Sequence, residues 1–98
     1  MKEQDIQAKI IKKLEAEGFV AINLIVASKS GYSDILACKP PHGRFWSIEV
    51  KKPGERPSRI QYYRLSQLRK RGAIAFWCDS YDMFLVEFNN CTILETNS

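Results

Sequence analysis

Two carboxylates and a lysine are spaced so that they could form a metal-dependent hydrolytic site. In segment 44–52 the alternate residues Trp46, Ile48 and Val50 are apolar, which predicts a strand with Glu49 and Lys51 together on its other face. Asp34 begins the apolar segment 35–38, and a hairpin would set it across from Glu49 and Lys51. Two carboxylates suit Mg²⁺, and a lysine beside the ion can orient an attacking water. The same residues could instead form an inter-strand salt bridge at a sheet edge.

Two further polar residues fall on the apolar stripes of predicted helices. Glu3 shares a stripe with Ile6 and Ile10, so its carboxylate would point toward a sheet from the first turn of a helix. Gln61 shares a stripe with Leu65 and would point inward in the same way. Either residue could also be an ordinary side chain at a helix end.

The elements that must position these side chains follow from hydrophobic periodicity and from the glycines and prolines that interrupt it. They are helix 3–17, strands 19–27, 33–39 and 44–52, helix 58–71 and strand 73–78. The tail stays open between a helix that begins at Ser80 and runs through Phe88 and a hairpin about residues 89–90. The predicted order is α-β-β-β-α-β plus a short tail, which is an α/β fold.

The composition predicts one globular domain. The chain has 98 residues, of which 45% are hydrophobic and 27% charged. Its longest apolar stretch, 19–27, is too short to span a bilayer, and charges interrupt the N-terminal segment where a signal peptide would be apolar. We therefore expect a cytoplasmic protein without a membrane segment, with residues 1–98 forming a single domain.

The cysteines do not indicate a metal site or a disulfide framework. Cys38, Cys78 and Cys91 form no C-x-x-C pair, and only His42 could join them as a soft ligand. Cys38 and Cys78 lie in apolar, strand-like segments, so we expect both to be small core residues.

Positive charge is concentrated in the middle of the chain. Residues 51–72 carry eight Lys or Arg against one Glu, whereas residues 79–98 carry four acids and no base. Such a density favours a polyanionic partner, although a solvated helix face would have the same composition. The candidate phosphate-binding residues are Lys52, Arg56, Arg59, Arg64, Arg69, Lys70 and Arg71.

Three sequence segments, taken together, resemble a known family. GYSDIL at 31–36, IEVKKPG at 48–54 and PSRIQ at 57–61 closely resemble the VRR-NUC domain, a branch of the PD-(D/E)XK nucleases, in its stand-alone minimal, phage- or bacterial-type form. The resemblance extends from Glu3 to about Ser80. It implies a restriction-endonuclease-like fold, with a central mixed β-sheet flanked by helices. The family usually has proline where this chain has Ser33, a change that removes no metal ligand.

The resemblance also implies roles for particular residues. Asp34, Glu49 and the backbone carbonyl of Val50 would be ligands of Mg²⁺ or Mn²⁺, Lys51 would be the catalytic lysine, and Gln61 and Glu3 would complete the catalytic set. The leading hypothesis is a divalent-metal-dependent DNA endonuclease. The alternatives are a catalytically inactive nucleic-acid-binding module on the same fold and a sequence-specific restriction enzyme, for which the chain offers little length to read bases.

The assembly and the substrate are the remaining expectations. Stand-alone minimal members of the family imply a homodimer that cuts branched DNA, with the four-way (Holliday) junction as substrate. Tyr62, Tyr63, Phe84 and Phe88 are more aromatic side chains than so small a core obviously needs, and aromatic residues are favoured in interfaces. These four rings could equally complete the core.

Overall fold

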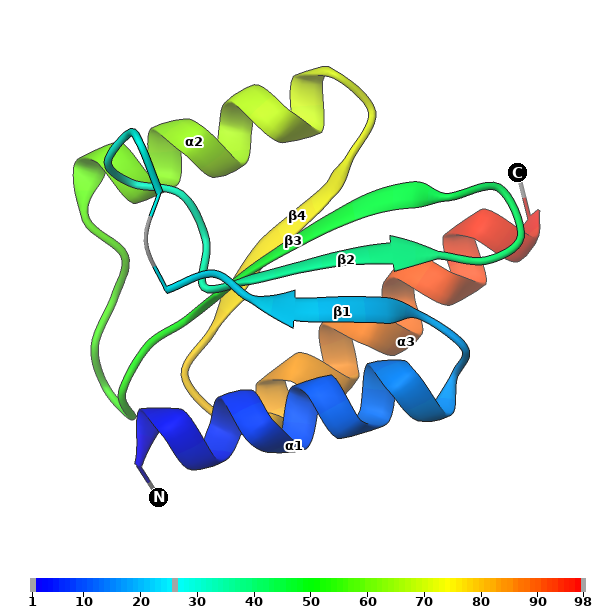
Figure 1. Ribbon diagram of the computed structural model, residues 1–98, viewed down its shortest axis with the longest axis horizontal. Helices are drawn as coiled ribbons and strands as arrows, with labels where there is room; N and C mark the ends of the chain where they lie inside the picture. The colour runs from blue at the N-terminus through cyan, green and yellow to red at the C-terminus, as the bar shows by residue number, and fades with distance from the viewer. Residues whose placement is uncertain (1, 26, 98) are drawn as a thin grey trace.

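The computed structural model describes residues 2–25 and 27–97 and shows a four-stranded sheet between helices (Figure 1). The elements are α1 (Glu3–Ala16), β1 (Val20–Asn23), β2 (Ile35–Lys39), β3 (Arg44–Val50), α2 (Arg59–Lys70), β4 (Ile74–Cys78) and α3 (Tyr81–Asn97). The strand order is β1-β2-β3-β4. β1, β2 and β3 are successively antiparallel, whereas β3 and β4 are parallel. The predicted mixed sheet flanked by helices is therefore confirmed.

The two faces of the sheet are covered differently. α1 and α3 lie on one face and α2 on the other (Figure 1). The face under α1 and α3 forms the main core, since apolar side chains from α1, β3 and α3 are almost fully buried there. They include Ile6, Ile10, Leu14, Trp46, Ile48, Val50, Phe84 and Phe88. Because side chains alternate along a strand, Ser47 and Glu49 point to the face that α2 covers.

The tail is a helix, and the alternative hairpin is wrong. The Oγ of Ser80 accepts a hydrogen bond from the backbone N–H of Met83 at 3.0 Å, as a helix cap does. α3 continues well past Phe88. The first half of α3 packs against the sheet because Phe84 and Phe88, one turn apart, are both buried in the core. In the part of the chain that the structure describes, no helix is long and apolar enough to cross a membrane.

The first strand is shorter than the sequence predicts. β1 ends at Asn23, which pairs with Ile35 at the start of β2. Among the described residues, one further hydrogen bond extends the pairing beyond this point, from the Leu24 N–H to the Asp34 carbonyl at 2.6 Å. Val26, within the predicted strand, lies outside the described residues.

The prediction that both Cys38 and Cys78 are core residues is wrong for one of them. Cys78 is buried as expected, but Cys38 is exposed. The register sets Cys38 beside the exposed Val20 and Phe45, on the part of the sheet that α2 does not contact among the described residues.

The four aromatic residues that could line an interface or complete the core fall into a buried pair and an exposed pair. Phe84 and Phe88 are 0% and 5% exposed, so both complete the core and neither is available at an interface. Tyr62 and Tyr63, on α2, are 40% and 55% exposed. Of these four aromatic residues, Tyr62 and Tyr63 therefore remain candidates for a contact with another molecule.

Candidate active site

The hairpin of β2 and β3 brings Asp34 beside the end of β3, as the sequence predicts. Ile35 pairs with Ile48, so Asp34 lies level with Glu49. The Val50 N–H donates to Oδ2 of Asp34 at 3.0 Å. This bond fixes one carboxylate oxygen of Asp34 against the strand that carries Glu49.

Gln61 connects the acid and the amine of this site. Its Nε2 donates to Oε1 of Glu49 at 2.9 Å, and its Oε1 accepts from Nζ of Lys51 at 3.4 Å. The same Oε1 accepts from the Ser58 N–H at 2.8 Å, which completes the capping box at the start of α2. Gln61 is thus a helix-end residue whose side chain also points into the site. The two alternatives that the sequence left open for it are both true.

Glu49 is the most buried charged residue of the described chain, at 2% exposure. Burial, and after it the negative charge of Asp34, raise the pKa of its carboxyl to about 8. Burial also raises the pKa of Asp34, against the lowering effect of the Val50 N–H. Two adjacent carboxylates in a buried site favour a shared proton or a bound cation.

The donor atoms fit a hard divalent cation. Oε2 of Glu49 is buried and has no hydrogen-bond partner among the described residues. No group of three His, Cys, Asp or Glu side chains that could hold a metal occurs within residues 2–25 and 27–97, so the side chains offer a carboxylate pair. Mg²⁺ is commonly held by one or two carboxylates, with waters and substrate phosphate completing its shell. A backbone carbonyl such as that of Val50 could add one oxygen.

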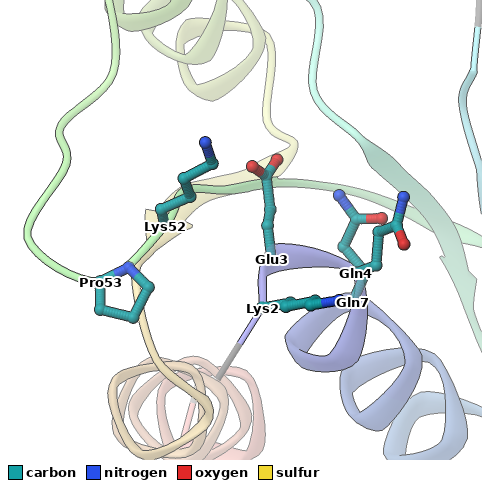
Figure 2. A pocket seen from close by; sticks show the side chains of 6 residues that line it. All are labelled: Lys2, Glu3, Gln4, Gln7, Lys52 and Pro53. Atoms are coloured by element: carbon teal, nitrogen blue, oxygen red, sulfur yellow. The ribbon is translucent and has the colours of Figure 1, made fainter.

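Glu3 lies at the edge of this site and lines a cavity of about 570 Å³. Its negative charge contributes to the raised pKa of Glu49, which places its carboxylate within electrostatic reach of the pair. Figure 2 shows the Glu3 carboxylate between the Lys52 ammonium and the amides of Gln4 and Gln7. Neither glutamine was predicted from the sequence, where their one signal is that they follow Glu3 in the first turns of α1.

The predicted phosphate-binding residues fall into two groups. Three of the arginines donate to backbone carbonyls: Arg64 to Ser30 at 3.1 Å, Arg69 to Ala75 at 2.9 Å and Arg71 to Gln67 at 3.1 Å. The other four are exposed, and none of their side chains has a hydrogen bond or salt bridge within the described part of the chain. They are Lys52, Arg56, Arg59 and Lys70.

The loop before Asp34 is packed against the start of α2. Gly31 has φ 85° and lies so close to Ile60 that an added Cβ would be 2.6 Å from the Ile60 Cγ1 and 3.1 Å from its backbone carbonyl. After it, Ser33 and Ser47 share a buried hydrogen bond of 2.7 Å. The serine in place of the family's proline therefore has a buried partner of its own. These contacts set the distance between Asp34 and Gln61.

Comparisons with known proteins find matches among solved structures. The sequence matches no family model and no curated protein. A solved VRR_NUC domain matches with a TM-score of 0.73 and 30% identity over 83% of this chain and 87% of that one. Hjc of Archaeoglobus fulgidus, a Holliday junction resolvase from an archaeal hyperthermophile, matches with a TM-score of 0.56 and 26% identity over 76% of this chain. That match covers 64% of Hjc.

Proposed function

The chain belongs to the VRR-NUC family, within the PD-(D/E)XK nucleases, and from this premise we propose that it is a divalent-metal-dependent DNA endonuclease. The observation that carries the proposal is the buried pair of Asp34 and Glu49, whose raised pKa values and unpartnered Glu49 oxygen call for a cation. Lys51 and Gln61 complete the site beside this pair. An inactive binding module would have no use for such a costly buried pair.

Each residue has a task in phosphodiester hydrolysis. Asp34 and Glu49 would hold Mg²⁺ or Mn²⁺, with the Val50 carbonyl as a further ligand. When bound, such a cation polarises the scissile phosphate and makes water a better nucleophile at neutral pH. Gln61 orients Glu49 and restrains Lys51, to which it is hydrogen bonded. The Lys51 ammonium directs the attacking water to phosphorus and stabilises the negative charge that develops on the phosphate.

We further propose that the enzyme selects branched DNA and acts as a homodimer. One carboxylate pair cuts one strand in each encounter, whereas a two-fold dimer presents two sites to the symmetry-related strands of a junction. The resolvase name of the archaeal neighbour and the exposed rings of Tyr62 and Tyr63 support this proposal. A light-scattering mass of one chain at working concentration would contradict the dimer but not the nuclease.

The test is incubation of the purified protein with four-way junction, flap, single-stranded and duplex DNA in Mg²⁺, Mn²⁺, Ca²⁺ or EDTA. We expect cleavage in Mg²⁺ or Mn²⁺, strongest for the junction, and binding without cleavage in Ca²⁺. Cleavage that continues in EDTA would contradict metal dependence. Equal cleavage of all four substrates would contradict structure selectivity alone.

A further inference from the structure

The face of the sheet opposite α1 and α3 is covered over only part of its area. Among the described residues α2 packs on β3 and β4 and not on β1 or β2. Figure 1 shows α2 over the end of the sheet that carries the carboxylate pair, whereas the hairpin end of β2 and β3 extends beyond it. Side-chain alternation leaves apolar residues of three strands on this uncovered part, which we call the open face. It consists of Val20 and Ile22 of β1, Leu36 and Cys38 of β2, and Phe45 of β3.

The strand register arranges the open face in two rows. Val20, Cys38 and Phe45 are level with one another, and Ile22 is level with Leu36. Val20 is 70% exposed, Ile22 53% and Phe45 40%. The solvated face of an antiparallel sheet normally carries polar side chains. A contiguous apolar patch in that place is therefore typical of a surface that another molecule covers.

Charge decides which molecule suits the open face. None of its five side chains is charged, whereas the whole chain has a net charge of +4. DNA binds chiefly through its phosphates, so an uncharged aliphatic surface offers it little. Two copies of a basic chain repel each other wherever their basic surfaces meet, and an uncharged surface avoids this repulsion. In a two-fold contact the same patch lies on both partners, and one apolar patch is complementary to another.

The size of the apolar surface also suits a second copy. A stable interface buries about 800 Å² on each partner, which is about an eighth of the 6252 Å² surface of this chain. The open face would form the apolar centre of such an interface. The side of α2 that contacts the loop before β2 would extend it, because Ile60 lies against Gly31 of that loop and Tyr63 lies beside Arg64, which covers the Tyr32 ring. Ile60 and Tyr63 are both exposed.

We propose that two copies of this chain associate through the open face across a two-fold axis. The inference rests on the proposed function, which includes a homodimer, and it adds the residues that form the contact. Asp34 and Glu49 make up the next row of the same face, about 7 Å along the sheet from Ile22 and Leu36. The interface thus borders the carboxylate pair of each copy. A dimer formed here holds two such pairs at a fixed separation, as paired cutting of a junction requires.

The first test measures the dissociation constant of the dimer by analytical ultracentrifugation. Val20→Lys places two like charges in the contact, one from each copy, and should raise the dimer Kd by about 100-fold or more. Val86→Lys is the matched control, because Val86 is also an exposed valine but lies on α3, on the other side of the sheet. It should leave the dimer Kd within about twofold.

If Val20→Lys does not fold, Ile22→Lys in the second row carries the same test. A monomeric unaltered protein, or a dimer Kd that the folded lysine variants of the open face leave unchanged, would overturn the inference.

Cys38 supplies a second signal without mutation. Its exposed thiol should react with a maleimide in dilute protein and become protected as the dimer forms, whereas Val20→Lys should keep it reactive at every protein concentration. Cys91, on α3, is the internal reference, and its labelling should not change with protein concentration. Protection of Cys38 that appears only when DNA is added would assign the open face to the substrate and overturn the inference.

Cleavage of a cruciform plasmid separates this inference from the nuclease proposal. The unaltered protein and Val86→Lys should release linear plasmid, because both strands are cut in one encounter. Val20→Lys should release nicked circles, because a single copy cuts one strand. Linear product from Val20→Lys would overturn the inference. If none of the three proteins cut the plasmid, the nuclease proposal would fail, and the dimer Kd and the labelling of Cys38 would still decide where two copies meet.

Discussion

At the scale of single residues, the ionised carboxylate of Glu49 destabilises the folded protein unless a cation or a proton neutralises it. The pKa of its carboxyl rises from an ordinary 4.5 to about 8 in the folded chain, chiefly through burial. Between these values the folded protein binds a proton that the unfolded chain has released. The free energy of unfolding of the metal-free protein must therefore fall as the pH rises through this window. Divalent metal should reverse the fall, because it stabilises the charged pair.

Glu49→Gln tests this cost directly. Without metal, the free energy of unfolding of the variant should fall much less between about pH 5 and pH 8 than that of the unaltered protein. At pH 8 the variant should be more stable by on the order of 1–3 kcal/mol. Urea unfolding at several pH values in EDTA measures both effects. If the variant were less stable than the unaltered protein at pH 8, the ionised pair of Asp34 and Glu49 would not destabilise the metal-free protein.

Gln61 has two tasks that mutation can separate. Gln61→Ala removes the bond to Glu49 and half of the capping box, whereas Ser58→Ala removes only the hydroxyl half of the cap. Both should cost about 1 kcal/mol of stability. Only Gln61→Ala should also reduce kcat, by about 10- to 100-fold, as is typical when a partner of a metal ligand is lost. Equal kcat in the two variants would mean that Gln61 acts as a cap alone.

At the scale of elements, the sequence predicts the positions of side chains correctly where alternation along a strand fixes the face on which each one lies. The apolar alternation of segment 44–52 places Glu49 and Lys51 on one face, and the turn at 40–43 sets Asp34 across from them. The tail could not be predicted in the same way, because the apolar residues 83–86 are consecutive and have neither a helical nor a strand period. The exposure of Cys38 depends on how far α2 reaches over the sheet, which no local pattern contains.

The cavity at the start of α1 was also beyond prediction from the sequence. Its walls come from residues 2–7 and 52–53, which approach one another only after the sheet and α1 have packed. The glutamines within it interrupt no hydrophobic pattern. A polar side chain is conspicuous in a sequence when it stands in an apolar stripe, as Gln61 does, and not when it lines an open pocket.

The packing of the loop before Asp34 on the start of α2 gives an element-scale prediction. In Gly31→Ala the new Cβ would meet the backbone of Ile60 and push the first turn of α2, with Gln61, away from Glu49. Gly72→Ala is the matched control, because its φ of 93° is equally unfavourable but nothing lies within 4 Å of the added Cβ. Both variants should lose about 1 kcal/mol from backbone strain. Gly31→Ala should lose more stability than the control, together with cleavage activity at temperatures where it stays folded.

If the two glycine variants had equal stability and equal cleavage rates, the contact between Gly31 and Ile60 would not position the site. Thermal unfolding and the cleavage rate per folded molecule distinguish these outcomes.

At the scale of the whole molecule, the basic residues should attract DNA through its phosphates and not through its sequence. Each phosphate contact contributes about 0.9 to the slope of log affinity against log salt on duplex DNA. Arg59→Gln should therefore flatten the slope by about one unit and leave the melting temperature unchanged. Arg64→Gln should also lower the melting temperature, because Arg64 bonds to Ser30 and lies over the ring of Tyr32 at 4.7 Å. If charge reversal at Arg56 and Arg59 together left binding unchanged, these residues would be only a solvated face.

The central claim is that Asp34 and Glu49 hold a metal with which the chain cuts DNA. It is tested most directly by the single-turnover rate of junction cleavage in Mn²⁺, measured for the unaltered protein and for Glu49→Gln. The variant preserves the size of the side chain, and circular dichroism can verify that it is folded. We predict cleavage by the unaltered protein that EDTA abolishes, and none detectable by the variant, which should still bind the junction. Cleavage by Glu49→Gln at the rate of the unaltered protein would contradict the account.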